Sequence, residues 1–184
     1  MPLIDLSVCD GVQFREWEDR FMSLYLSAFT TENYSGHYLD ELEERVWLHG
    51  LFANHHARCY IFHEGPVLAA FLLAADTGYD RRLPADMKAQ LEGHGALSIA
   101  ELTVTPAFRR QGLASRLVMQ CVADATGHTG NVIVRTNTHA DPARRLYERN
   151  GFDNWGSLRV PNPMLQNGKL YWQLVDKTYY RRNL

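Results

Sequence analysis

The clearest pattern of apolar and polar positions lies in the middle of the chain, over residues 97–125. Residues 97–104 are largely apolar, which predicts a strand, and Pro106 then removes a backbone donor and ends it. After a basic loop, apolar residues return at helical spacing at Leu113, Leu117, Val118, Cys121, Val122 and Ala125. Gly127 follows the last of them, at a position where helices commonly stop. The pattern therefore predicts a strand, a tight loop and an amphipathic helix.

The loop between this strand and helix has the composition of an anion site. The first N–H groups of a helix lack intrahelical partners and, together with the helix dipole, attract anions. Gly112 allows a bulky anion to approach the backbone, and Ala114 keeps the first helical turn free of a large side chain. Arg109 and Arg110 add positive charge. The sequence therefore predicts that residues 109–114 bind a pyrophosphate group.

The other elements follow from patterns of the same kinds. The strands that alternation and apolar runs predict are residues 3–8, 57–63, 67–75, 97–104, 132–135, 152–155 and 170–175. Helical spacing predicts helices over residues 13–29, 113–125 and 143–150, the last with Asp141 as its cap. It also predicts a second helix that follows the first and has Leu39, Leu42 and Val46 on its apolar face. We expect an α/β fold with a mixed sheet and helices on both faces. It forms one domain over residues 1–184, with a tail over residues 177–184.

Composition and charge narrow the classes of function. Nineteen basic and 21 acidic residues give a formal charge of −2, which gives no sign of binding to nucleic acid or to an anionic membrane. No apolar run approaches the ~20 residues of a membrane-spanning helix, and the first residues do not resemble a signal peptide. The three cysteines and eight histidines have neither disulfide-framework nor metal-site spacing. We therefore expect a reduced, cytoplasmic protein that uses no metal.

Two motifs resemble the signatures of the GNAT superfamily of N-acetyltransferases. Residues 104–114 read Val-x-Pro-x-x-Arg-x-x-Gly-x-Ala, which is similar to the family's acetyl-CoA-binding motif. Residues 143–152 resemble its second signature. The resemblance covers residues 57–175 as a pattern and residues 100–152 as motifs. It implies the GNAT fold, a mixed and mostly antiparallel sheet whose fourth and fifth strands splay apart, with acetyl-CoA lying in the gap.

The resemblance also implies which residues hold acetyl-CoA. The pantetheine arm is expected to pair with the backbone of Leu102, Thr103 and Val104. The phosphates are expected on Arg109, Arg110, Gln111, Gly112, Leu113 and Ala114. Relatives usually carry a pantetheine-binding asparagine three residues before Ala143, whereas Ala140 stands there. Asn137 is the candidate substitute. Arg144 and Arg145, on a short exposed helix, either reach a phosphate of the nucleotide or are solvated.

Acetyl transfer to an amine needs an acid for the leaving thiolate and a route for the amine's proton. Tyr147 stands where the family pattern places a tyrosine that acts as general acid; the alternative is a helix tyrosine packed on the sheet. Glu101, on the strand beside the expected thioester, is the candidate base; ordered water is one alternative, and an ordinary strand-end carboxylate is another. The acidic second helix, with Glu41 and Glu44, is interpreted either as a solvated face or as an attractor of a cationic acceptor.

The sequence thus predicts an acetyl-CoA-dependent N-acetyltransferase that moves the acetyl group to a primary amine by direct attack in a ternary complex. The alternative is a non-catalytic acyl-CoA-binding or regulatory module on the same fold. A small-molecule amine and a protein N-terminus or lysine are both open as acceptors, and so is a homodimer. Trp155, Tyr171 and Trp172 either line the acceptor pocket or belong to the core.

Overall fold

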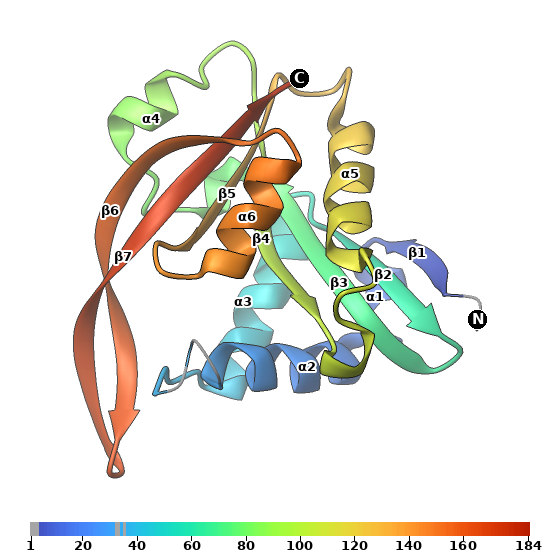
Figure 1. The fold of residues 1–184 in the computed structure, drawn as a ribbon, viewed down its shortest axis with the longest axis vertical. Coiled ribbons are helices and arrows are strands. Elements are labelled where there is room, and N and C mark those ends of the chain that lie inside the picture. Colours follow the sequence, from blue (N-terminus) through green and yellow to red (C-terminus); the bar gives the residue numbers. More distant parts are fainter. Residues whose placement is uncertain (1–3, 32–33, 35) are drawn as a thin grey trace.

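The computed structural model describes residues 4–31, 34 and 36–184. Seven strands form one sheet in the order β1-β2-β3-β4-β5-β7-β6 (Figure 1). The β4–β5 pair is parallel, and every other neighbouring pair in this sheet is antiparallel. The expectation of a mixed, mostly antiparallel sheet is therefore confirmed.

The elements alternate along the chain in the order that the sequence patterns predicted, with short additions. The strands are β1 (Asp5–Cys9), β2 (Arg58–Glu64), β3 (Val67–Asp76), β4 (Leu97–Val104), β5 (Asn131–Asn137), β6 (Asp153–Gln166) and β7 (Lys169–Asn183). The helices are α1 (Gly11–Phe14), α2 (Glu18–Thr30), α3 (Glu41–Asn54), α4 (Ala85–Ala89), α5 (Leu113–Ala125) and α6 (Asp141–Arg149). No helix in the described part of the chain is both long and apolar enough to cross a membrane.

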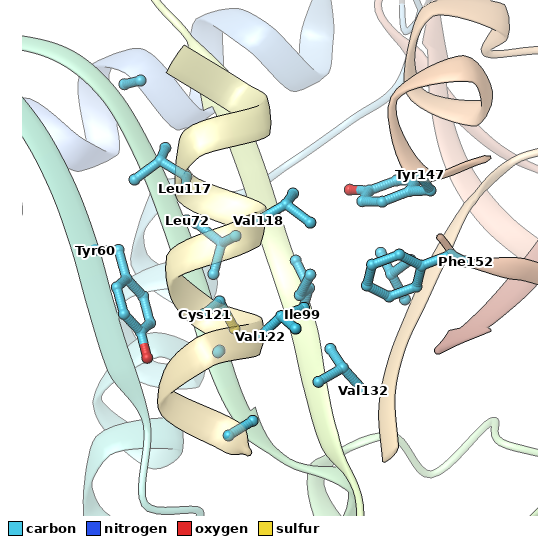
Figure 2. Packing of buried hydrophobic residues seen from close by; sticks show 14 of the residues in the cluster. Tyr60, Leu72, Ile99, Leu117, Val118, Cys121, Val122, Val132, Tyr147 and Phe152 are labelled. Atoms are coloured by element: carbon cyan, nitrogen blue, oxygen red, sulfur yellow. The ribbon is translucent and has the colours of Figure 1, made fainter. Parts of the chain in front are cut away.

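Helices cover both faces of the sheet. Figure 1 shows α5 and α6 on one face and α1 to α3 on the other. The apolar run of β3 is buried on both faces, as predicted, because Leu72 belongs to the core beneath α5 whereas Leu73 belongs to the core beneath α2 and α3. In Figure 2, Val118 and Val122 of α5 lie against the sheet beside Ile99 of β4.

The gap expected between the fourth and fifth strands is present. The parallel ladder joins Leu97 to Val132 and Ile99 to Val134, and it goes no further. Beyond Ile99, β4 keeps its pairing with β3 but has no ladder with β5. The C-terminal half of β4 therefore presents backbone N–H and C=O groups to the gap that have no partner strand there.

The N-terminal helices differ from the prediction. The helix predicted over residues 13–29 is interrupted: α1 ends at Phe14, and α2 begins at Glu18. Asp10 caps α1 by accepting hydrogen bonds from two of its backbone N–H groups at 2.9 and 3.0 Å. The predicted strand start at residue 3 and part of the predicted loop over residues 30–36 lie outside the described residues.

Two local assignments near α3 and α6 are wrong. Leu42 and Val46 are 73% and 67% exposed, so they do not form the buried face of α3, which is made by Leu48 and Leu51 instead. Asp141 does not cap α6, because the cap position is Ala140 and Asp141 is the first helical residue.

The C-terminal segment is a long hairpin rather than two short strands and a tail. β6 and β7 turn at Asn167 and Gly168, which have φ values of 50° and 72°, typical of a two-residue hairpin loop. Residues 177–183 of the predicted tail form the end of β7, which inserts between β5 and β6. Tyr179 and Tyr180 are each 1% exposed there.

Candidate active site

A groove of about 640 Å³, the donor groove, follows the open half of β4 toward α5 and α6. It contains most of the residues expected to hold acetyl-CoA: Leu102, Thr103, Val104, Arg109, Arg110, Gly112, Leu113 and Ala114. Val134, Arg135 and Thr136 line it from β5, and Tyr147 lines it from α6. The gap between the strands therefore continues into the loop that precedes α5.

The beginning of α5 has free backbone donors. Gly112 is its N-cap with φ 78° and ψ 2°, and no side chain caps this end of the helix. The N–H of Arg116 bonds back to the carbonyl of Gly112 at 3.1 Å, which leaves the N–H groups of Leu113, Ala114 and Ser115 without an intrahelical partner. The loop is held to the strand by Arg109, whose Nε donates to the carbonyl of Val104 at 3.3 Å. This arrangement suits a pyrophosphate.

Three of the residues expected to hold acetyl-CoA do not line the donor groove: Gln111, Asn137 and Arg144. Arg144 instead donates to the Tyr180 hydroxyl at 3.3 Å and to Asp141 at 3.2 Å. The Asn137 side chain is buried, and its Oδ1 has no hydrogen-bond partner among the described residues. On α6, it is Arg145 that lines the groove.

Tyr147 reaches the donor groove from α6. Figure 2 shows its ring between α6 and α5, with the hydroxyl directed toward α5. The ring is 5% exposed and makes an edge contact with Phe152, with centroids 5.7 Å apart. Burial raises the pKa of Tyr147 well above its ordinary value, so the phenol carries its proton at neutral pH. It is therefore able to act as a proton donor.

A second groove of about 1070 Å³, the acceptor groove, lies on the α3 side of the sheet. α3, the segment after β3, and the β6–β7 hairpin supply its walls. Ala100, Glu101 and Arg135 line both grooves, at the point where β4 and β5 separate. The two grooves therefore meet through the gap in the sheet.

A β-bulge directs Glu101 to the acceptor side of the sheet. Ile99 pairs with Ala74 and Glu101 pairs with Leu73, so Ala100 is an extra residue in β4. Directly opposite side chains share a face, and Leu73 belongs to the core beneath α2 and α3. Burial, and secondarily the Glu44 carboxylate, raise the pKa of Glu101 to about 8, while Lys177 and Arg135 act in the opposite direction.

Comparison with known proteins identifies the family. Residues 14–152 match the model of the acetyltransferase (GNAT) family. The chain belongs to the GNAT family. Its reaction is therefore acetyl transfer, and its co-substrate is acetyl-CoA. Among curated protein sequences, none matches this GNAT chain.

Solved structures share the fold along nearly the whole chain. Arabidopsis thaliana NAA60 in complex with a bisubstrate analogue is 16% identical, with a TM-score of 0.69 and 98% of each chain covered. An N-acetyltransferase from Staphylococcus aureus Mu50 is 15% identical, with a TM-score of 0.67 over 97% of this chain and 98% of that one. Arabidopsis thaliana NAA60 in complex with acetyl-CoA is 16% identical, with a TM-score of 0.64 over 99% of each chain. At these identities the likeness shows the GNAT fold.

Some groove residues of this GNAT protein were not predicted. Tyr34 lines the donor groove, and burial, followed by Glu101, raises the pKa of its phenol. No motif in the sequence marks this position. Asn150 also lines the groove and accepts a hydrogen bond from the Ser115 hydroxyl at 2.7 Å, which joins α6 to the first turn of α5. Asn150 lies within the second GNAT signature, so the sequence could have indicated that it lines the groove.

The acidic face of α3 divides into two parts. Glu44 lines the acceptor groove and accepts a hydrogen bond from the Tyr25 hydroxyl at 2.9 Å. Burial raises the pKa of Glu44. Glu41 is outside the groove and pairs with Arg45 at 2.9 Å. Among the three aromatic candidates for the acceptor pocket, Trp172 lines the groove, whereas Tyr171 and Trp155 do not.

Proposed function

We propose that this GNAT protein transfers the acetyl group of acetyl-CoA directly to a primary amine. The observation that carries the proposal is the meeting of the donor and acceptor grooves at Glu101, in the gap between β4 and β5. A thioester in one groove and an amine in the other would approach each other there. Holding two reactants in this way lowers the barrier by about 7–11 kcal/mol in good intramolecular analogues. A module that only bound acyl-CoA would have no use for the second groove.

The residues at this junction fit the two proton transfers of the reaction. The amine nitrogen attacks the thioester carbonyl carbon and loses its proton to the Glu101 carboxylate. The unpaired backbone N–H groups of Leu102 or Val104 stabilise the oxyanion. The carbon–sulfur bond then breaks, and the leaving thiolate takes the proton of the Tyr147 phenol. A carboxylate whose pKa is about 8 is a stronger base than an ordinary glutamate, which favours removal of an amine proton.

The test is release of free thiol from acetyl-CoA in the presence of amines, with the acetylated product identified by mass spectrometry. The panel contains small amines, lysine-containing peptides and peptides with free N-termini. Amine-dependent thiol release with a matching N-acetyl product supports the proposal. Binding of acetyl-CoA without thiol release for any amine would favour the non-catalytic module.

We also propose a reducing, cytoplasmic location, which the three free cysteines favour.

A further inference from the structure

The acceptor groove is lined by side chains of both charges. Carboxylates come from α3 and the residue before it, at Asp40, Glu43 and Glu44. Cationic groups come from the segment after β3, where Asp80 also lines the groove, and from β5 and β7; they are Arg81, Arg82, Arg135 and Lys177. Glu101 lies where this groove meets the donor groove. A ligand that carries only an ammonium group would be complementary to half of this surface.

The charge of Arg135 is already balanced. Its guanidinium donates to Asp80 at 3.0 Å and 3.2 Å, and the Asp80 side chain is 5% exposed. The Tyr179 hydroxyl also donates a hydrogen bond to Asp80, at 2.7 Å from Oδ2. Arg135 is therefore part of the wall of the groove rather than a free cation.

Lys177 differs from Arg135 because its ammonium group has no such partner. Within the described part of the chain it makes no hydrogen bond and no ion pair within 4 Å. It is partly buried in β7, where burial and the nearby Arg135 and Arg82 lower its pKa to about 8. A ligand that filled the groove without pairing Lys177 would remove water from an unpaired cation, which is unfavourable.

We propose that the acceptor is a free amino acid, whose amine meets Glu101 and whose carboxylate meets Lys177. This inference rests on the proposed amine acetylation and names its substrate class. Glu101 and Lys177 line the same groove and, among the described residues, form no ion pair within 4 Å, so neither group is occupied by the other and a zwitterion would offer a partner to each. The remaining walls include Trp47, Leu51, Leu170 and Trp172, which favour an apolar side chain on the acceptor.

The test compares acceptors that share a side chain and differ in the carboxylate. The twenty protein amino acids are assayed first. L-Phenylalanine is then compared with L-phenylalaninamide and with the tripeptide Phe-Gly-Gly, and the same is done for any better amino acid. Rates are expressed per deprotonated amine, because the amide has a less basic amine. We expect kcat/KM for the amino acid to exceed that for the amide by about 10- to 100-fold, the size of one charge-assisted hydrogen bond.

The variant Lys177→Met keeps the apolar length of the side chain and removes its charge. We expect the ratio of kcat/KM for amino acid over amide to fall to about 1 in this variant. Lys169→Met is the matched control, since Lys169 lies on the same strand at the exposed hairpin end, and the ratio should stay at the wild-type value. If Lys177 only supported the fold, both substrates would lose rate equally and the ratio would not change.

Other outcomes separate this inference from the proposed function. If the amide or the tripeptide is acetylated as well as the amino acid, the inference is wrong and amine acetylation stands. If acetyl-CoA binds and no amine of any kind is acetylated, the proposed function itself is wrong. Calorimetric titration of N-acetyl-L-phenylalanine into the CoA-bound protein provides a readout without turnover, and it should show tighter binding than N-acetyl-L-phenylalaninamide in the wild type but not in Lys177→Met.

Discussion

The Tyr179 hydroxyl donates a 2.7 Å hydrogen bond to Asp80, which also receives the guanidinium of Arg135. This contact joins the C-terminal strand to the segment after β3 and fixes the charge of the acceptor wall. Asp80→Asn would leave Arg135 as a partly buried, unpaired cation. We expect the free energy of unfolding to fall by about 3 kcal/mol, measured by urea denaturation.

Tyr179→Phe is the control for this prediction. It removes the two hydrogen bonds of the Tyr179 hydroxyl, which donates to Asp80 and accepts from Arg135, and it leaves the ion pair intact. The expected loss is therefore smaller, about 1–2 kcal/mol. Equal losses in the two variants would show that the ion pair adds nothing to stability.

The second prediction concerns the beginning of α5. Gly112→Asp should weaken acetyl-CoA binding by roughly 10- to 100-fold in calorimetry, because the new carboxylate faces the pyrophosphate. Gly127→Asp is a matched control at the other end of the same helix. Gly112 and Gly127 have φ of 78° and 83°, and neither has a heavy atom within 4 Å of an added Cβ, so the backbone strain is similar. The assignment of the phosphate site fails if both variants bind acetyl-CoA equally well.

The third prediction concerns Tyr147. Tyr147→Phe keeps the edge contact with Phe152 and removes the proton, so kcat should fall by ~10²–10⁴ while acetyl-CoA affinity stays nearly the same. Tyr180→Phe is the control, because the Tyr180 hydroxyl receives Arg144 rather than facing the donor groove. Single-turnover kinetics isolates the chemical step. A similar rate in both variants would assign Tyr147 to the core alone.

The fourth prediction concerns the pH dependence of Glu101. The carboxyl, with a pKa of about 8, becomes a base only when it loses its proton, so kcat/KM should rise with pH through an inflection near that value. Glu101→Gln should remove this inflection from the pH–rate profile. A variant profile with the same inflection would mean that the proton leaves through ordered water or another group.

The raised pKa of Glu101 also predicts how the stability of the fold changes with pH. The folded protein keeps the Glu101 proton up to about pH 8, whereas the unfolded chain releases it near pH 4.5, so stability should fall as pH rises through that window. Lys177 has the opposite effect. Its ammonium group loses its proton near pH 8 in the folded protein and near pH 10.5 in the unfolded chain, so it makes stability rise with pH between these values. Glu101→Gln should therefore be more stable than the wild type at pH 8, measured by urea denaturation at a series of pH values. If the free energy of unfolding changed with pH in the same way in both proteins, Glu101 would not have the raised pKa.

Signals within a short stretch of sequence predicted much of the donor groove. Gly112 with the helix after it and the apolar run of β3 depend on neighbouring residues, so spacing alone was informative there. Tyr147 was found through the resemblance of residues 143–152 to the second GNAT signature. The prediction was wrong where the outcome depends on distant pairing. Residues 177–184 read as a tail because nothing near them shows that β7 inserts beside β5.

The acceptor groove was harder to predict for the same reason. Lys177 becomes a groove residue only when the β6–β7 hairpin returns to the sheet, although the Asn167-Gly168 pair is a recognisable hairpin signal. Leu42 and Val46 have helical spacing but face solvent, because the packing of α3 on the sheet decides which face is buried. Tyr34 reaches the donor groove from a segment without a motif.

The bulge in β4 makes the site depend on backbone geometry as well as on side chains. Ile99 and Glu101 are two residues apart, yet they face opposite sides of the sheet because Ala100 is an extra residue between them. If residues 99–101 alternated strictly, the Glu101 carboxylate would share the face of Ile99 beneath α5, with every reactive side chain still in the sequence. In this strand, a comparison of residue identities would therefore report the chemistry as intact in a relative whose carboxylate lies in the other groove.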